Sequence, residues 1–226
     1  MLYAEGGWRV RNPEKDELEM AARKERMLDA GFRLFAQRGI AAVSMQEVAA
    51  ACELGVATLY RYFNTKLALV IAVGTRQWEN FAEESRRLDR EVNAEQMTAA
   101  EQLEHYLNYY IWLYRDYRDL LRFNQSFNSY VLREQASPEQ LAPYLRAIDS
   151  FEGMFHALYE KGQRDGTIRT DLSEQKMFAT TAHIMLAAVA RFAQGLVYSA
   201  EDEADRTEEL LLLKRMMLRE FVKDTT

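Results

Sequence analysis

The chain has 226 residues, of which 48% are hydrophobic and 28% charged, and its formal net charge at pH 7 is −6. This length allows one or two compact domains, and the composition is typical of a soluble, mostly helical protein. The chain has no apolar run of the roughly 18 residues that a membrane span needs, and no leader pattern at its start, so we expect a cytoplasmic protein with no membrane partner. Its single cysteine excludes an intrachain disulfide and a cysteine-built metal cluster within one chain.

Charge is distributed unevenly along the chain. Residues 1–66 hold ten Lys and Arg against nine Asp and Glu, whereas residues 67–226 hold nineteen against twenty-six. The difference has the direction expected for an N-terminal nucleic-acid-binding region, but it is small. Any contact with phosphates must therefore depend on where a few cations are placed.

The first predicted helix follows a polar lead. Residues 1–12 have no hydrophobic periodicity and predict a flexible arm, which either contacts DNA or has no role. Asn12-Pro13 is a cap and first-turn signal, so a helix is expected from there to Arg38, where Gly39 ends it. Its apolar stripe is expected to pack against the following helices and consists of Leu28, Phe32 and Phe35.

Residues 44–66 predict two short helices, a tight turn and the start of a third helix. Ser44 and Glu47 have the spacing of a capping box, and Gly55 can cap a second helix from Val56 to Phe63. Leu59 and Phe63 recur at helical spacing and should face inward. The opposite, exposed side of this helix is expected to carry Val56, Ala57, Thr58 and Arg61.

Groups that can bind phosphate flank this exposed side. Tyr60 and Tyr62 offer hydroxyl donors, and Lys66 lies in the first turn of the next helix, where a cation is unfavourable unless an anion binds nearby. Two short helices with the second presented outward predict a helix-turn-helix whose second helix enters the major groove of double-stranded DNA.

These segments resemble the DNA-binding domain of the TetR family of bacterial transcriptional regulators. The resemblance is carried by Ala30 to Gly39, Ser44 to Ala50 and Thr58 to Lys66 (TLYRYFNTK), and the chain departs from the family's usual pattern at Glu53, Gly55 and Val56. It implies an all-α fold in which a three-helix helix-turn-helix domain with its N-terminal arm, residues 1–66, is followed by a helical-bundle ligand-binding and dimerisation domain, residues 67–226. It also implies DNA contacts, with Gln46 near a base edge, from Ser44, Gln46, Ala57, Thr58, Tyr60, Arg61, Tyr62 and Lys66.

Beyond the helix-turn-helix, apolar periodicity and caps predict further helices at residues 65–90, 98–115, 116–133, 138–164, 173–198 and 203–221. The first of these carries Trp78 and Phe81 in its apolar stripe and connects the two domains. The last two have more apolar surface than one bundle face needs, so two copies should form a four-helix dimer interface and present two recognition helices to a palindromic operator.

The helices between residues 98 and 133 are unusually rich in aromatic side chains. At helical spacing these are first of all core residues, but so many tyrosine hydroxyls favour a partly polar cavity. Glu152 lies in an apolar stripe, where a carboxylate needs either an Arg partner or a cationic ligand. The resemblance implies an effector pocket here, and we expect it to be lined by Tyr106, Tyr109, Tyr110, Trp112, Phe123, Phe127, Tyr130, Phe151, Glu152 and Phe155.

An enzyme is the rival class. Di-iron bundles need two Glu-x-x-His pairs, whereas Glu101 and His105, like Glu152 and His156, are four residues apart. The sequence has no nucleophile elbow or phosphate loop either, so we expect no catalytic residue, no metal and no cofactor. A third interpretation is a helical ligand-binding protein without specific DNA readout. We favour a ligand-responsive regulator, a repressor in most members of the family, that a small apolar or aromatic effector releases from DNA.

Overall fold

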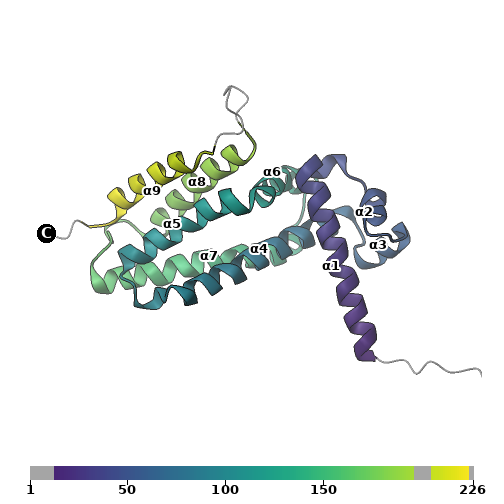
Figure 1. The fold of residues 1–226 in the computed structure, drawn as a ribbon, viewed down its shortest axis with the longest axis horizontal. Helices are drawn as coiled ribbons and strands as arrows, with labels where there is room; N and C mark the ends of the chain where they lie inside the picture. Colours follow the sequence, from purple (N-terminus) through teal and green to yellow (C-terminus); the bar gives the residue numbers. More distant parts are fainter. Residues whose placement is uncertain (1–12, 196–204, 224–226) are drawn as a thin grey trace, which may run out of the picture.

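In the computed structural model, residues 13–195 and 205–223 are described, and they fold as a bundle of helices (Figure 1). Within these ranges no strand forms apart from an isolated bridge between Ile168 and Val222, so the predicted all-α fold is confirmed. The helices are α1 (Pro13–Arg38), α2 (Met45–Ala51), α3 (Val56–Tyr62), α4 (Lys66–Glu91), α5 (Ala99–Asp116), α6 (Arg118–Arg133), α7 (Pro138–Asp165), α8 (Glu174–Ala193) and α9 (Thr207–Phe221).

Local side-chain caps explain where most of these helices begin. Capping boxes start α2, α5 and α7. In each, the Ser or Thr hydroxyl accepts a hydrogen bond from the backbone N–H three residues later. The Glu or Gln side chain at that later position accepts one from the backbone N–H of the cap residue. Thr65 and Ser173 cap α4 and α8. Because these bonds satisfy backbone groups that a helix end leaves free, the starts could be predicted from short sequence patterns.

Two predicted helix boundaries are wrong. α8 ends at Ala193, five residues before the predicted end, because Gly195 adopts a positive φ of 83° just beyond it. α9 begins at Thr207, where the Asp205 carboxylate accepts from the Thr207 backbone N–H at 3.1 Å. The predicted arm at residues 1–12 and the junction at 196–204 lie outside the described residues.

The helix-turn-helix occupies one end of the molecule, where α2 and α3 lie beside α1 (Figure 1). From this end α4 runs along α7, and α5 lies between this pair and the pair formed by α8 and α9. α6 packs both on α1 and on α8. The helix-turn-helix end is therefore joined to the bundle through α4 and α6.

One hydrophobic core continues through this junction. Phe123 of α6 is fully buried, and its ring centroid lies 5.9 Å from that of Phe32 and 6.5 Å from that of Phe35, both on α1. On α4, a Cβ at Gly74 would lie 3.0 Å from the ring of Tyr144, so α4 and α7 approach closely there. A displacement of α4 or α6 in the bundle would therefore be felt by α1.

Candidate nucleic-acid interface and ligand cavity

α3 is a short helix that packs by one face. Leu59 and the following Phe63 are buried, as predicted. Val56 was predicted on the exposed side, and this is wrong: it is half-buried against the core, because it lies three residues before Leu59 on the same helix face. The outward side of α3 is formed by Ala57, Tyr60 and Arg61, with Thr58 half-buried beside them.

The other residues predicted to contact DNA surround this side with different exposure. Gln46 is exposed on α2, whereas Tyr62 is half-buried and packs on the core. The Ser44 hydroxyl accepts from the Glu47 backbone N–H at 3.2 Å, and the Glu47 carboxylate accepts from the Ser44 backbone N–H at 2.7 Å. Ser44 therefore has a structural role in starting α2, in addition to its predicted contact with DNA.

An ion pair ties the start of α2 to the end of α1. Arg38 Nη2 lies 2.8 Å from Glu47 Oε1. Hydrogen bonds from the Ser44 backbone and hydroxyl, together with the Arg38 guanidinium, lower the pKa of Glu47 to about 2. The carboxylate therefore stays charged at neutral pH and holds Arg38 in place.

The turn between α2 and α3 passes through a residue with an unusual backbone conformation. Glu53 has a φ of 58°, in the left-handed region that glycine adopts more easily. A residue with a Cβ is disfavoured there by about 1 kcal/mol. Glu53 therefore makes this turn at some cost in stability.

Lys66 begins α4 directly after the Thr65 cap, whose hydroxyl accepts from the Ala68 backbone N–H at 3.0 Å. The Lys66 ammonium lies 5.3 Å from the ring centroid of Tyr130, a contact of the cation–π type. Burial and the nearby Arg133 guanidinium lower the pKa of Lys66. An anion bound at this helix start would relieve that repulsion.

A cavity of about 420 Å³ lies in the bundle between α4, α5, α6, α7 and α8. Its size is within the range of small-molecule sites, roughly 300–1,000 Å³. Apart from its aromatic residues, the lining has polar side chains from Asn124, Asn128, Asp149 and Glu152. Eight lining residues are aromatic, and they are Trp78, Phe81, Tyr106, Tyr109, Tyr110, Tyr144, Phe151 and Phe178.

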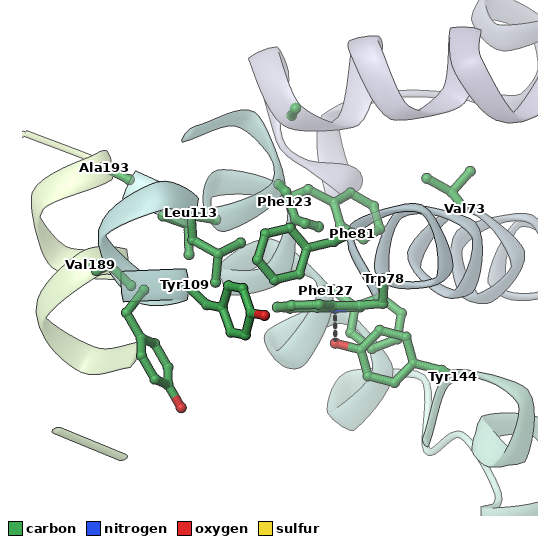
Figure 2. Packing of buried hydrophobic residues seen from close by; sticks show 14 of the residues in the cluster. Val73, Trp78, Phe81, Tyr109, Leu113, Phe123, Phe127, Tyr144, Val189 and Ala193 are labelled. Carbon is green, nitrogen blue, oxygen red and sulfur yellow. Dashed lines mark hydrogen bonds between the residues drawn. The ribbon is translucent and has the colours of Figure 1, made fainter. Parts of the chain in front are cut away.

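The structure brings together only half of the residues predicted to line the effector pocket. Those in the cavity lining are Tyr106, Tyr109, Tyr110, Phe151 and Glu152. Those outside it are Trp112, Phe123, Phe127, Tyr130 and Phe155. The latter meet other side chains instead: the Phe127 ring, for example, stacks on Tyr144 with centroids 4.2 Å apart, and both residues are labelled in Figure 2.

Glu152 was expected to be buried in an apolar stripe, and this is wrong. The residue is exposed while also lining the cavity, as is Asp149 one turn before it on α7. Among the described residues neither carboxylate takes part in an ion pair or a hydrogen bond to another group. The Arg partner that was one interpretation of Glu152 is thus not present in that part of the chain.

The hydroxyl of Tyr144 joins three helices at the cavity wall. It accepts a hydrogen bond from Trp78 Nε1 on α4 at 3.2 Å, drawn as a dashed line in Figure 2, and donates to Asn124 Oδ1 on α6 at 2.5 Å. Burial raises the pKa of Tyr144 to about 12. Trp78 and Tyr144 are 66 residues apart, so no local pattern could have predicted this contact.

The hydroxyls of the tyrosines on α5 also have partners. Tyr109 donates to Asp89 on α4, whose Oδ1 lies 2.9 Å from His105 Nε2. The Tyr110 hydroxyl donates to that of Tyr106 at 3.4 Å. With its hydroxyl held by Asp89, Tyr109 contributes mainly its ring to the cavity.

The described part of the chain offers little support for a metal centre or a membrane span. Residues 13–195 and 205–223 contain no group of three or more His, Cys, Asp or Glu that could hold a metal ion. No helix in these ranges is long and apolar enough to cross a membrane. His105 bonds to Asp89, His156 lies 3.0 Å from the Glu174 carboxylate, and His183 is exposed, so the histidines do not converge on one site.

Sequence comparison identifies the segment that contains the helix-turn-helix. Residues 27–73 match the family described as bacterial regulatory proteins, tetR family. An uncharacterized HTH-type transcriptional regulator of Mycobacterium tuberculosis is 46% identical over 74 residues, which are 33% of this chain and 32% of that protein. The HTH-type transcriptional repressor KstR of Rhodococcus jostii is 40% identical over 68 residues, 29% of this chain and 32% of that protein. The chain thus spans about a third of the length of the curated relatives it matches.

Structural similarity extends over the whole fold. The fatty acid degradation regulator FadR from Bacillus halodurans superposes with a TM-score of 0.68 at 16% identity, covering 93% of this chain and 97% of that one. A transcriptional regulator from Saccharomonospora viridis in complex with choline has a TM-score of 0.70 at 18% identity, covering 90% and 99%. FadR from Bacillus subtilis in complex with stearoyl-CoA has a TM-score of 0.65 at 17% identity, covering 86% and 95%.

Proposed function

We propose that this chain, which belongs to the tetR family of bacterial regulatory proteins, is a transcriptional repressor that a small molecule releases from its operator. The observation that carries the proposal is the outward side of α3. It exposes Ala57, Tyr60 and Arg61 at one end of the molecule, inside the segment that matches the family. Gln46 on α2 is exposed beside it.

The proposed DNA contacts fall into two groups. Ala57 and Thr58 are assigned to base edges in the major groove, because α3 is short and carries small residues that allow close approach. Gln46, which is exposed on α2, is assigned to a base edge as well. Phosphate contacts are assigned to the remaining residues of the set, namely Ser44, Tyr60, Arg61, Tyr62 and Lys66. Phosphate contacts position the protein and carry no sequence information.

A homodimer is part of this proposal. Ile184 on α8 and Leu212 and Met216 on α9 are large apolar side chains with exposed fractions of 40%, 51% and 56%. Leu212 and Met216 are four residues apart and therefore lie on one face of α9. Burying this face against a second copy would place two recognition helices on a palindromic site. Residues 67–226 would then form the ligand-binding and dimerisation domain, and residues 1–66 the arm and the DNA-binding domain.

The switch is assigned to α4, which both proposed domains share. α4 starts at Lys66 beside the DNA-binding helices, and its Trp78 and Phe81 line the cavity. A ligand that moves Tyr144 would alter its hydrogen bonds to Trp78 and Asn124, and with them the positions of α4 and α6. A coupling free energy of about 1–3 kcal/mol would lower operator affinity roughly five- to 150-fold.

Two structures of similar fold were determined with different ligands, one with stearoyl-CoA and one with choline. The fold therefore accommodates chemically unrelated molecules, and the ligand has to be inferred from the lining of each cavity. For this chain we propose a small molecule that contacts mainly aromatic rings.

Binding to the DNA upstream of the chain's own gene tests the proposal. Wild-type protein should retard that fragment in a gel and protect two half-sites in footprinting, with centres one helical turn or a multiple of it apart, about 34–36 Å per turn. Arg61→Ala should weaken this binding, whereas Lys176→Ala, a change at an exposed cation on α8 far from α3, should leave it unchanged. If the wild-type protein binds this fragment no better than unrelated DNA of equal length, the chain is a helical ligand-binding protein without specific DNA readout.

A further inference from the structure

The geometry of the cavity points to a ligand with a delocalised or quaternary positive charge, an organic monocation, and not to an anionic or a neutral one. This inference rests on the proposed function, because it names the chemical class of the effector in the same site. It follows from three features of the lining: many aromatic rings, two unpaired carboxylates and no cationic side chain.

Aromatic rings make up about half of the lining, eight of seventeen residues. Each ring has a negative face, which attracts a cation placed within about 6 Å of the ring centroid. Rings from α4, α5, α7 and α8 surround the same space: Trp78, Tyr110, Phe151 and Phe178 each come from a different helix. A weakly hydrated cation in this space could contact several ring faces at once.

The carboxylates provide the charge that such a cation needs. Asp149 and Glu152 both line the cavity and are also exposed, so we place them at its mouth. Within the described residues neither has an ion-pair partner, and none of the residues lining the cavity is Lys, Arg or His. The negative charge at the mouth is thus free to interact with a cationic ligand.

The pKa values of two lining tyrosines indicate how the cavity wall acts on a negative charge. The pKa of Tyr106 is raised well above its usual value, first by burial and then by the neighbouring Tyr110 and the charge of Glu152. Burial also raises the pKa of Tyr110 to about 12. A negative charge is therefore disfavoured at the cavity wall. A carboxylate or phosphate ligand would meet the same desolvation and the same repulsion, with no cation in the lining to offset them.

Burial alone would disfavour a cation as well, so the type of cation matters. A primary ammonium is strongly hydrated and loses much on entering an apolar cavity. A quaternary or delocalised cation is weakly hydrated, and ring faces can replace its hydration shell. The hydroxyls of Tyr109 and Tyr144 are already held by Asp89 and Asn124, which leaves their rings as the available surface.

Binding of three probes to the full-length protein tests this inference. We would use benzyltrimethylammonium, its neutral isostere neopentylbenzene, in which carbon replaces the ammonium nitrogen, and the anionic thioester stearoyl-CoA. Affinities would come from titration calorimetry and from shifts of the melting temperature at equal free ligand concentration. The cation should bind at least roughly tenfold more tightly than the isostere, as several desolvated cation–π contacts allow.

Variants that neutralise the two carboxylates test whether they attract the cationic probe. Glu152→Gln should weaken binding of the cation roughly two- to fivefold, as expected for a partly exposed charge pair, and Asp149→Asn with Glu152→Gln roughly tenfold. Neither change should alter binding of neopentylbenzene. Glu160→Gln is the matched control, because Glu160 is an exposed carboxylate on α7 that does not line the cavity. It should leave all affinities within about twofold, since surface substitutions of this kind have small effects.

Two results would overturn the inference: neopentylbenzene binding as tightly as the cation, or stearoyl-CoA binding more tightly than either. Wild-type protein from the same preparation would also be tested on the DNA upstream of its gene. Retained DNA binding together with either of these results would reject the cationic ligand and leave the proposed function standing. Cation binding without any DNA binding would support the ligand class and reject the repressor.

Discussion

The helix-turn-helix end and the cavity end of this molecule are both built from helices, yet their functional residues are arranged in opposite ways. At the helix-turn-helix end the candidate residues lie within one continuous stretch, 44–66, and half of them are exposed. In the cavity they come from five helices, between Trp78 and Leu186, and they surround one space. The first site depends on local structure, and the second depends on how distant helices pack.

This difference explains how the two ends compare with other proteins. Sequence relatives match only about a third of the chain, around the helix-turn-helix, whereas structures at 16–18% identity superpose over about nine-tenths of it. A DNA-binding surface needs particular residues at particular positions. A bundle needs only apolar side chains of suitable total volume, so the fold persists while the lining of its cavity changes.

The largest expected effect tests whether the two ends are energetically separate. Phe123→Ala should lower the free energy of unfolding by about 3–5 kcal/mol, because it empties a fully buried site between α6 and α1. Urea unfolding should show one transition for both ends if the shared core couples them. Leu132→Ala, at a residue on the same helix with an exposed fraction of 78%, should change stability by less than about 0.5 kcal/mol. Two separate transitions in the wild-type protein would argue against the coupling.

A second test concerns the surface that neither site uses. Leu212→Glu should convert the proposed dimer into a monomer, since an unpaired carboxylate in an apolar interface costs several kcal/mol. Sedimentation at micromolar concentration would measure it. Leu132→Glu would serve as the control, because Leu132 is an exposed leucine on α6, outside the two helices of the proposed interface. A wild-type protein that is already monomeric under these conditions would remove dimerisation from the proposal.

Substitutions of Lys66 test the proposed DNA contacts of the helix-turn-helix end. Lys66→Ala should weaken binding to all DNA sequences alike and lower the slope of log affinity against log salt by about one unit, because one phosphate contact is lost. The cation also lies over Tyr130, so Lys66→Met, which keeps most of the apolar contact, separates the two roles. An unchanged salt slope in both variants would assign Lys66 to packing on α6.

The smallest expected effect lies in the turn between α2 and α3. Glu53→Gly should raise the free energy of unfolding by about 0.5–1 kcal/mol, because glycine adopts the positive φ without strain. Thermal unfolding would detect it, and Glu53→Ala, which keeps the Cβ, should show no such gain. A loss of stability on introducing glycine would mean that the Glu53 side chain makes a contact worth more than the strain.

The sequence alone was enough to predict most of the helices, because short residue patterns mark where they begin. Ser44 with Glu47 forms the capping box that its spacing predicts, and the structure shows two more with the same spacing, Thr98 with Glu101 and Ser137 with Gln140. The inward packing of Leu59 and Phe63 also follows from helical periodicity. The prediction that Val56 is exposed was wrong, because a helix of two turns has too few residues for periodicity alone to show where its apolar face ends.

Only the tertiary structure decided which aromatic residues surround a cavity. Tyr109 and Tyr130 both lie in aromatic-rich helices and were both predicted to line the pocket. In the structure Tyr109 lines the cavity, whereas the ring of Tyr130 contacts the Lys66 ammonium near the helix-turn-helix. Trp78 and Tyr144 meet across 66 residues. Helical periodicity tells which face of a helix is apolar, but where that face meets a gap depends on the relative positions of five helices, and no local pattern encodes those positions.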